Sequence, residues 1–210
     1  MSTFLTLLLI RHGETILNAE SRFRGHSEVD LSPRGRRQAG ALARNLPRSF
    51  PIGHVYSSPL PRCLETARPL AMALGLTVVV EPRLIDLDYG EWSGRQIAEV
   101  AEQFPGDYAA WLAGDLSLRF PGGELLQAVV ERMQSFLDEV IECHEGEVVA
   151  MVTHNVLCQM ATCLLLDIPV DSFQSIGHDP GNVSVFRWHA GTVHADARNL
   201  PAEGDFSSCA

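Results

Sequence analysis

The sequence predicts an α/β fold, in which a mostly parallel β-sheet forms the middle layer of a three-layer sandwich and helices flank it. Strand-like and helix-like segments alternate along the chain, a pattern typical of a parallel sheet with helices on both faces. The chain has 210 residues, 46% hydrophobic and 20% charged, which is enough for one well-buried core. We therefore expect a single domain over residues 1–197 and a flexible tail at 198–210.

Six short apolar segments predict the strands of this sheet. The first of them is hydrophobic at every position except Thr6, as expected for a strand that is buried on both faces. The last two are joined through the turn His189-Ala190-Gly191. The expected strands cover residues 5–10, 54–57, 77–80, 148–153, 183–188 and 192–197.

Longer segments between the strands predict helices. Ser32 followed by Pro33 is a favourable start, because serine caps the first turn and proline suits the first helical position, so a helix is expected from there to about residue 46. Other helices are expected at 60–74, 124–143 and 154–166, and residues 95–120 predict a helical excursion outside the sheet. In the 124–143 segment the hydrophobic residues with helical spacing are Leu126, Val129, Val130, Met133, Phe136, Leu137 and Val140.

The composition argues against several classes of protein. Five cysteines without a C-x-x-C pair favour reduced, packed thiols over a disulfide framework or a zinc cluster. A formal net charge of -10 disfavours nucleic acid as a partner. No apolar run reaches the roughly 20 residues of a membrane helix. The first apolar run has no basic residue before it and no cleavage site after it, so we expect a cytoplasmic protein rather than a secreted one.

Polar residues gather just after three of the predicted strands. Arg11 and His12 follow the first strand, and Ser57 and Ser58 end the second, with Arg62 a few residues further on. Thr153, His154 and Asn155 end or follow the strand at 148–153. Because ligands of open α/β sheets bind at the carboxyl ends of the strands, these side chains are expected to form one site.

These residue types suit phosphate chemistry. The planar guanidinium of arginine binds two phosphate oxygens and keeps its charge, and Arg11 and Arg62 are the candidates. A neutral imidazole such as that of His12 can attack phosphorus and give a phosphohistidine that water later hydrolyses. Gly13 leaves room for a phosphate to approach the backbone. The overall negative charge means that an anionic substrate has to be attracted by this local positive charge.

Several ordered blocks of the sequence resemble the histidine phosphatase superfamily in its phosphoglycerate mutase-like branch. The first block is Arg11-His12-Gly13-Glu14-Thr15 with the residues before it and Asn18. Further blocks lie at 22–25, 30–32, 38–39, 57–67, 88–94, 121–124 and 152–155, in the order of the family. The resemblance covers residues 5 to about 185 and implies a phosphoglycerate mutase-like fold.

The resemblance implies roles for the residues at matching positions. His12 would be the phosphorylated nucleophile. Arg11, Arg62 and His154 would surround the phosphoryl group, and Asn18 would donate a further hydrogen bond. Glu65, one helical turn from Arg62, is expected to orient that arginine.

The acidic proton donor of the family falls at Asp86, where most relatives have glutamate. Asp88 lies two residues further on, would point to the same face of an extended strand, and is the competing candidate. Arg24, Gly25 and Asn155 are expected to take part in substrate binding, and Asn155 stands where many relatives have glycine.

Three functions are compatible with these residues: a phosphatase, a phosphoglycerate mutase, and a catalytically inactive binding module. The mutases of the family carry a lysine and an arginine pair where this chain has Ile97, Leu112 and Ala113. A second phosphate would therefore lack a positive partner, which favours hydrolysis. An inactive module is disfavoured because every charged catalytic position holds a competent residue.

We accordingly expect a metal-independent phosphatase without a cofactor that acts on a small-molecule phosphate monoester. No nucleic-acid or membrane partner is expected, and the oligomeric state and the particular ester stay open. Trp92 and Trp111 are expected to pack the excursion, and most of the remaining histidines are expected at the surface or in turns. Among them only His178, in the loop Gly177-His178-Asp179-Pro180, is a further candidate for a role at the site.

Overall fold

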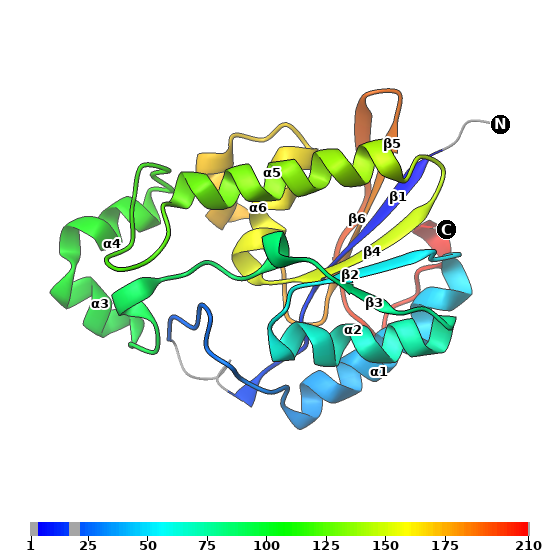
Figure 1. The fold of residues 1–210 in the computed structure, drawn as a ribbon, viewed down its shortest axis with the longest axis horizontal. Helices are drawn as coiled ribbons and strands as arrows, with labels where there is room; N and C mark the ends of the chain where they lie inside the picture. The colour runs from blue at the N-terminus through cyan, green and yellow to red at the C-terminus, as the bar shows by residue number, and fades with distance from the viewer. Residues whose placement is uncertain (1–3, 17–21, 210) are drawn as a thin grey trace.

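The computed structural model describes residues 4–16 and 22–209, and its centre is a six-stranded sheet of order β3-β2-β4-β1-β5-β6 (Figure 1). Strand β1 pairs in parallel with β4, and β2 pairs in parallel with both β4 and β3. Strands β5 and β6 are added antiparallel at the other edge. The strands are β1 (Leu5–Arg11), β2 (His54–Ser57), β3 (Val78–Val80), β4 (Val148–Thr153), β5 (Val183–His189) and β6 (Thr192–Leu200).

Helices cover both faces of the sheet, which confirms the predicted fold class (Figure 1). Helices α1 (Pro33–Ser49) and α2 (Pro61–Leu74) lie on one face. Helices α5 (Leu126–Cys143) and α6 (Asn155–Leu165) lie on the other. All seven hydrophobic residues that predicted α5 are buried in it, so one apolar stripe faces the sheet.

Local sequence explains where these elements begin. The side chain of Ser32 accepts a hydrogen bond from the Gly35 amide, and Pro33 takes the first position of α1, as predicted. In β1 alternate side chains enter different cores: Leu7 and Leu9 pack with α5 and α6, whereas Leu8 and Ile10 pack with α1 and α2. This two-sided burial explains why the strand is hydrophobic at consecutive positions from Leu7 to Ile10. Because β1, β2 and β4 are parallel, their carboxyl ends meet at one edge of the sheet.

The segment between β3 and α5 forms a separate helical unit beside that edge. Helices α3 (Ile97–Gln103) and α4 (Pro105–Leu112) lie at the left of Figure 1, away from the sheet. Aromatic rings hold this unit together. The Trp92 ring packs at 4.9 Å from that of Phe120, and the Trp111 ring at 5.6 Å from Phe120. Both tryptophans therefore pack the excursion, as expected.

The chain end differs from the expected flexible tail. Strand β6 continues to Leu200, and Ala202, Phe206 and Cys209 are buried against α1 and the sheet. The Phe206 ring lies 6.4 Å from the ring of Phe50, and the Asn45 side chain donates to the Ala202 carbonyl oxygen. Three apolar residues without any period do not predict a helix or a strand, and only the tertiary contact shows that they are anchored.

Replacing Phe206 by alanine is expected to lower the free energy of unfolding by about 3–5 kcal/mol, because a fully buried ring is lost and a cavity is left. Equilibrium unfolding in urea measures this loss. Glu203→Ala, at an exposed position of the same segment, serves as the control and should change stability little. A Phe206→Ala protein as stable as the control would mean that the tail is detached in solution.

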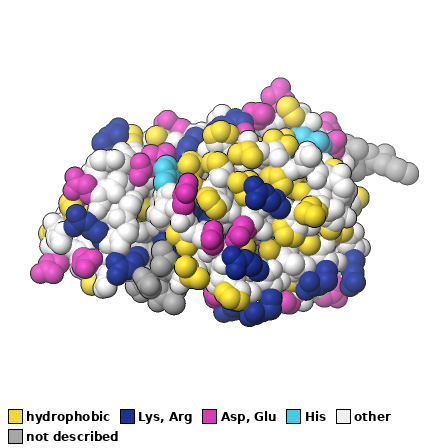
Figure 2. Space-filling view, turned by 60° about the horizontal axis from the view of Figure 1, so that its bottom comes forward, with side chains coloured by type: hydrophobic (Ala, Val, Ile, Leu, Met, Phe, Trp, Pro, Cys, Tyr) yellow, Lys and Arg dark blue, Asp and Glu magenta, His cyan; other side chains and the backbone are white. Residues whose placement is uncertain are grey.

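The surface carries both apolar and charged side chains. Figure 2 views the molecule from the side of α1 and α2, where hydrophobic side chains lie among interspersed acidic and basic ones. The exposed apolar residues include Met72 on α2 and Val79 and Val80 on β3. Across the described residues, no helix is long and apolar enough to cross a membrane.

Candidate active site

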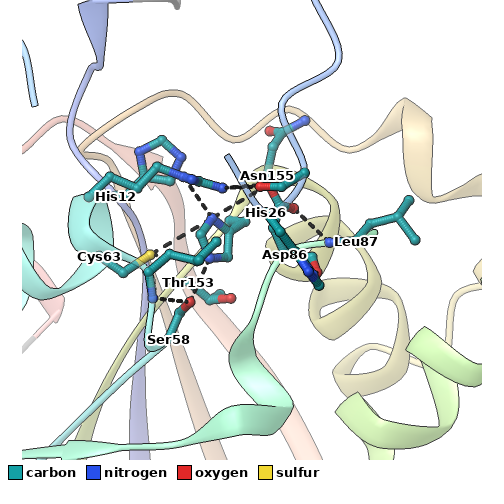
Figure 3. Close-up of polar contacts among 12 residues, drawn as sticks. His12, His26, Ser58, Cys63, Asp86, Leu87, Thr153 and Asn155 are labelled. Atoms are coloured by element: carbon teal, nitrogen blue, oxygen red, sulfur yellow. Dashed lines mark hydrogen bonds and ion pairs between the residues drawn. The ribbon is translucent and has the colours of Figure 1, made fainter. Parts of the chain in front are cut away.

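A cavity of about 380 Å³ opens at the edge where β1, β2 and β4 end, between the sheet and the helical unit. Most residues that the sequence indicated reach it. Figure 3 shows His12, Asp86 and Asn155 arriving there from three separate segments of the chain. The cavity is lined by the candidates Arg11, His12, Arg24, Arg62, Asp86 and Asn155. Asn18, the remaining predicted hydrogen-bond donor, lies outside the described residues.

His12 is buried directly after β1 and presents one ring nitrogen that carries a lone pair. Its Nδ1 atom lies 2.7 Å from the carbonyl oxygen of Gly13, so Nδ1 carries the proton and donates it. The Nε2 atom is therefore the basic nitrogen of the neutral ring. Burial, reinforced by the charges of Arg62 and Arg11, holds the pKa of His12 well below its usual value, which keeps the ring neutral.

Two glycines make the close packing behind His12 possible. A Cβ atom on Gly13 would meet the backbone oxygen of Gly35 at 2.7 Å, and one on Gly35 would meet that of Glu14 at 2.0 Å. The Gly13 amide donates to Thr66 of α2 at 3.0 Å. The turn after β1 is thus clamped between α1 and α2, and it fixes the position of the imidazole.

Arg62, on the first turn of α2, is fully buried and bonded through all of its nitrogens. Its Nη1 donates to the Ser27 carbonyl oxygen at 2.9 Å. Its Nη2 donates to the Gly25 carbonyl oxygen and to Asp86 Oδ2, each at 2.8 Å. Its Nε donates to Nδ1 of His154 at 3.2 Å. Gly25 thereby contributes a carbonyl group that orients Arg62.

Glu65 does not orient Arg62 as expected. Its carboxylate accepts from the Leu31 amide at 2.9 Å and lies 3.6 Å from Arg36 on α1. The favourable spacing of Glu65 and Arg62 on one helix turn suggested a local pair. The guanidinium of Arg62 instead bonds to Asp86. Folding brings these two residues together, and their spacing in the sequence does not predict the contact.

His154 lies beside His12, with 5.4 Å between the ring centroids, but it does not line the cavity. Its Nδ1 accepts from Arg62, so Nε2 carries the proton and donates to Ser58 Oγ at 2.7 Å. Burial holds the pKa of His154 well below its usual value, with Arg62 adding to the effect. The neighbouring Cys63 is no competing nucleophile, because burial raises the pKa of its thiol to about 12.

Asp86 faces the cavity, whereas Asp88 does not line it. The Asp86 Oδ1 atom accepts from the Leu87 amide at 3.0 Å, and Oδ2 lies 2.8 Å from Arg62 and 3.6 Å from His154 Nδ1. Burial raises the pKa of Asp86 above its usual value, although Arg62 opposes the shift. The Asp88 carboxylate instead bonds to the main chain, because it accepts a hydrogen bond from the Gly90 amide at 2.9 Å.

The segment that carries Asp86 is held from several sides. Arg132 of α5 donates to the Asp86 carbonyl oxygen at 3.2 Å, and the ring of His26 lies 2.8 Å from the same oxygen. Thr153, at the end of β4, donates its hydroxyl to the Leu84 carbonyl oxygen at 2.8 Å. The carboxyl group of Asp86 is therefore presented by a fixed backbone.

Arg11 and Arg24 supply further positive charge to the cavity. Arg11 Nη1 donates to Asn155 Oδ1 at 2.9 Å and to the His178 carbonyl oxygen at 2.5 Å. Within the described part of the chain, the buried Nε atoms of Arg11 and Arg24 have no hydrogen-bond partner. Burial lowers the pKa of both arginines. Two unpartnered cationic donors beside a cavity are suited to an anion.

The wall opposite His12 was not predicted as a binding surface from the sequence. Aromatic and apolar side chains form most of it, with the amides of Gln159 and Gln174 and the side chain of Arg22. These residues come from the excursion, the segments around residues 23 and 89, α6 and the short 3-10 helix Val170–Ser175. Trp111, which was expected only to pack, both packs and borders the cavity. The apolar and aromatic members are Phe23, Tyr89, Ile97, Tyr108, Trp111, Leu112 and Val156.

The fold and the site together define an α/β protein whose sheet edge presents a neutral histidine among arginines, which is the chemistry of a phosphate site. The sequence model of the histidine phosphatase superfamily (branch 1) matches residues 7–201. The chain therefore belongs to this superfamily, as its sequence blocks suggested.

Named relatives of the chain include phosphatases. It is 39% identical over 179 residues to phosphoserine phosphatase 1 of Hydrogenobacter thermophilus, which covers 85% of this chain and 84% of that protein. It is 38% identical over 184 residues to a bifunctional protein of Mycobacterium tuberculosis, of which it spans 50%. The crystal structure of a putative alpha-ribazole-5'-P phosphatase from Escherichia coli superposes with a TM-score of 0.83 at 26% identity, over 96% of this chain and 98% of that one.

Proposed function

We propose that the protein hydrolyses a small-molecule phosphate monoester through a phosphohistidine on His12. The observation that carries this proposal is the tautomer of His12, whose Nε2 lone pair is free because Nδ1 donates to the Gly13 carbonyl oxygen at 2.7 Å. The ring is rigidly held, neutral and placed in a cavity that is also lined by four arginines (Arg11, Arg22, Arg24 and Arg62) and a carboxyl group. These are the groups that phosphoryl transfer requires.

The reaction proceeds in two displacements. In the first, Nε2 of His12 bonds to phosphorus while the bond from phosphorus to the ester oxygen breaks, and Asp86 gives its proton to that oxygen. In the second, water attacks the phosphohistidine, its proton passes to the Asp86 carboxylate, and the bond from phosphorus to nitrogen breaks. Inorganic phosphate leaves, and both side chains return to their initial protonation states.

The arginines hold the phosphoryl oxygens during both displacements. Arg11 and Arg24 line the cavity, and Arg62 adds a buried charge that acts on both His12 and Asp86. Fixed donors stabilise the charge that spreads over the oxygens in the transition state. His154 acts through Arg62, whose Nε donates to its Nδ1 atom, and is therefore a positioning residue.

The opposite wall favours hydrolysis over phosphoglycerate mutase activity. Ile97 and Leu112, which replace the basic residues of the mutases, both line the cavity. A second phosphate group on the substrate would face these two apolar side chains, and the nearby Arg22 donates its Nη1 to the Gly94 carbonyl oxygen at 2.7 Å. The aromatic members of the wall, including Tyr89, Tyr108 and Trp111, favour an ester whose alcohol part is apolar or aromatic. Phosphoserine and α-ribazole phosphate occur in the names of two similar proteins. They are suitable test substrates because their alcohol parts differ strongly in polarity.

The first experiment is the hydrolysis of an aryl phosphate in the presence of a chelator, followed by a panel of metabolite phosphates. We expect turnover that the chelator leaves unchanged, a phosphoprotein that is labile in acid, and a preference for esters with apolar alcohols. A protein that is inert on the whole panel would support a binding module. Interconversion of phosphoglycerate isomers faster than hydrolysis would support a mutase.

Asp86→Asn is expected to lower kcat by about 10²–10⁴-fold for esters with a poor leaving group and much less for aryl phosphates. Asparagine retains the size of the side chain but has no acidic proton to donate. Asp88→Asn is the matched control, since Asp88 lies outside the cavity wall. A series of esters with alcohols of increasing pKa measures the effect. If kcat falls more steeply with the pKa of the alcohol in the Asp88 variant than in the Asp86 variant, Asp88 is the proton donor instead of Asp86.

The pH profile follows from the same two groups. Hydrolysis requires neutral His12, whose pKa lies well below its usual value, so activity rises as the pH increases through that low value. It also requires protonated Asp86, whose pKa is raised, so activity with poor leaving groups falls as the pH increases through that raised value. We expect an acidic optimum for such esters and loss of the alkaline limb in Asp86→Asn.

A further inference from the structure

A cluster of side chains of metal-binding types lies at the amino ends of the parallel strands, opposite the cavity at their carboxyl ends. His54 is the first residue of β2, His144 follows the last residue of α5, and Glu147 precedes β4. Strands β2 and β4 are parallel, so their first residues lie at one edge and the catalytic candidates at the other. Nothing in the proposed phosphatase reaction uses these three side chains.

We propose that His54, His144 and Glu147 bind a divalent transition-metal ion, and that their chemistry favours zinc. The Glu147 Oε2 atom lies 3.0 Å from Nε2 of His54 and 2.7 Å from Nδ1 of His144. The two imidazole rings are 4.3 Å apart between centroids, and all three potential ligand atoms lie within 4.8 Å of one another. Two imidazoles with one carboxylate form a ligand set typical of zinc, with a remaining position for water.

The distances require only a small adjustment to admit the ion. Ligand atoms about 2.0–2.1 Å from a tetrahedral zinc ion are separated from each other by roughly 3.4 Å. The present separations of 3.0 and 2.7 Å are those of hydrogen bonds and must widen by about 0.4 and 0.7 Å to reach that value. His54 and Glu147 can make this change, because their side chains are 37% and 47% exposed.

The surrounding groups hold the ligands in place. The Nε2 atom of His144 lies 2.9 Å from the Tyr56 hydroxyl, and a ring that donates its Nε2 proton there directs the lone pair of Nδ1 at the ion. The Glu147 amide donates to the His144 carbonyl oxygen at 3.1 Å, and the Glu147 carbonyl oxygen accepts from the Thr6 amide at 2.9 Å. His144 and Glu147 therefore lie in a hydrogen-bonded turn, and His54 lies at the start of β2.

A metal ion here stabilises the folded state and takes no part in the proposed hydrolysis. It joins the turn between α5 and β4 to the start of β2, two segments far apart in the sequence. Because an ion bound only by the folded state raises stability by mass action, zinc is expected to raise Tm. The alternative is a cluster in which Glu147 only accepts hydrogen bonds from the two histidines, and this cluster needs no ion.

The test is a zinc titration of the full chain, first freed of metal, in competition with a chromophoric chelator. We expect one ion per chain and a rise in Tm with zinc concentration. In His54→Ala and in Glu147→Gln, zinc affinity should fall at least tenfold and the rise in Tm should disappear. His194→Ala, which removes an exposed histidine outside the cluster, should bind zinc like the wild type.

Cooperative thermal unfolding of the two cluster variants in the absence of zinc shows that they are folded. A wild-type Tm without zinc together with lost zinc binding supports the proposal. A wild-type chain that does not compete for zinc, or variants that bind zinc as tightly as the wild type, would overturn it and leave the hydrogen-bonded cluster. Either result is independent of the proposed function, since zinc binding and Tm are read without a substrate.

Discussion

Replacement of His12 by alanine is expected to lower phosphatase turnover by about 10⁴-fold or more, because the proposed mechanism has no other group that can form the bond to phosphorus. The neighbouring histidine cannot substitute for it, since both ring nitrogens of His154 are bonded to Ser58 and Arg62. Steady-state hydrolysis of an aryl phosphate measures the loss. Rapid acid quenching should trap phosphate on the wild-type protein and none on the variant.

The His12 variant also permits a chemical rescue. Alanine leaves a space at the end of β1 that opens into the cavity, and added imidazole is expected to restore part of the turnover by attacking the bound ester. The matched control is His194→Ala, which should keep wild-type turnover. Retention of more than a tenth of the activity in His12→Ala would rule out the phosphohistidine pathway and indicate direct attack by water.

The elements of the fold could be predicted because their signals are local. The hydrophobic run of β1, the cap formed by Ser32 and the helical spacing in α5 each follow from neighbouring residues. The placement of Arg11, His12, Arg62 and Asp86 at one cavity followed from strand ends and from the family resemblance. Parallel strands bring these ends together whatever the sequence in between.

The features that sequence reasoning missed depend on contacts between distant segments. Glu65 was a reasonable local partner for Arg62, but Asp86, which is 24 residues away, takes that place. Phe206 is anchored by Phe50, although nothing around it predicts a helix or a strand. His54 and His144 were expected at the surface or in turns. His144 and Glu147 are neighbours in one turn, and only the pairing of β2 with β4 brings His54 to them.

Arg62→Met is expected to damage both stability and activity. The substitution leaves the buried carboxylate of Asp86 without its cation and the carbonyl oxygens of Gly25 and Ser27 without a donor. Removing one member of a buried ion pair costs about 3–5 kcal/mol of unfolding free energy. Turnover should fall by at least about 10³-fold as well, because the charge between His12 and Asp86 is lost.

Equilibrium unfolding and aryl phosphate hydrolysis separate the two effects. Arg62→Lys serves as a second variant, because it keeps the charge but cannot reproduce the four bonds of the guanidinium. In the double variant Arg62→Met with Asp86→Asn, no carboxylate is left unpaired, so part of the stability should return while activity stays low. A single variant as stable as the wild type would contradict the buried ion pair.

The pH dependence of the Arg62→Met deficit identifies Asp86 as its source. In the wild type Arg62 opposes the rise that burial imposes on the pKa of Asp86, so without the arginine this pKa rises further. A group whose pKa is raised in the folded state stabilises the fold below its unfolded pKa and loses that contribution as the pH rises through the folded value. The stability gap between Arg62→Met and the wild type should therefore be largest at neutral pH and should narrow as Asp86 becomes protonated. A gap that stays constant from neutral to acidic pH would instead assign the loss to the carbonyl groups of Gly25 and Ser27, which do not titrate.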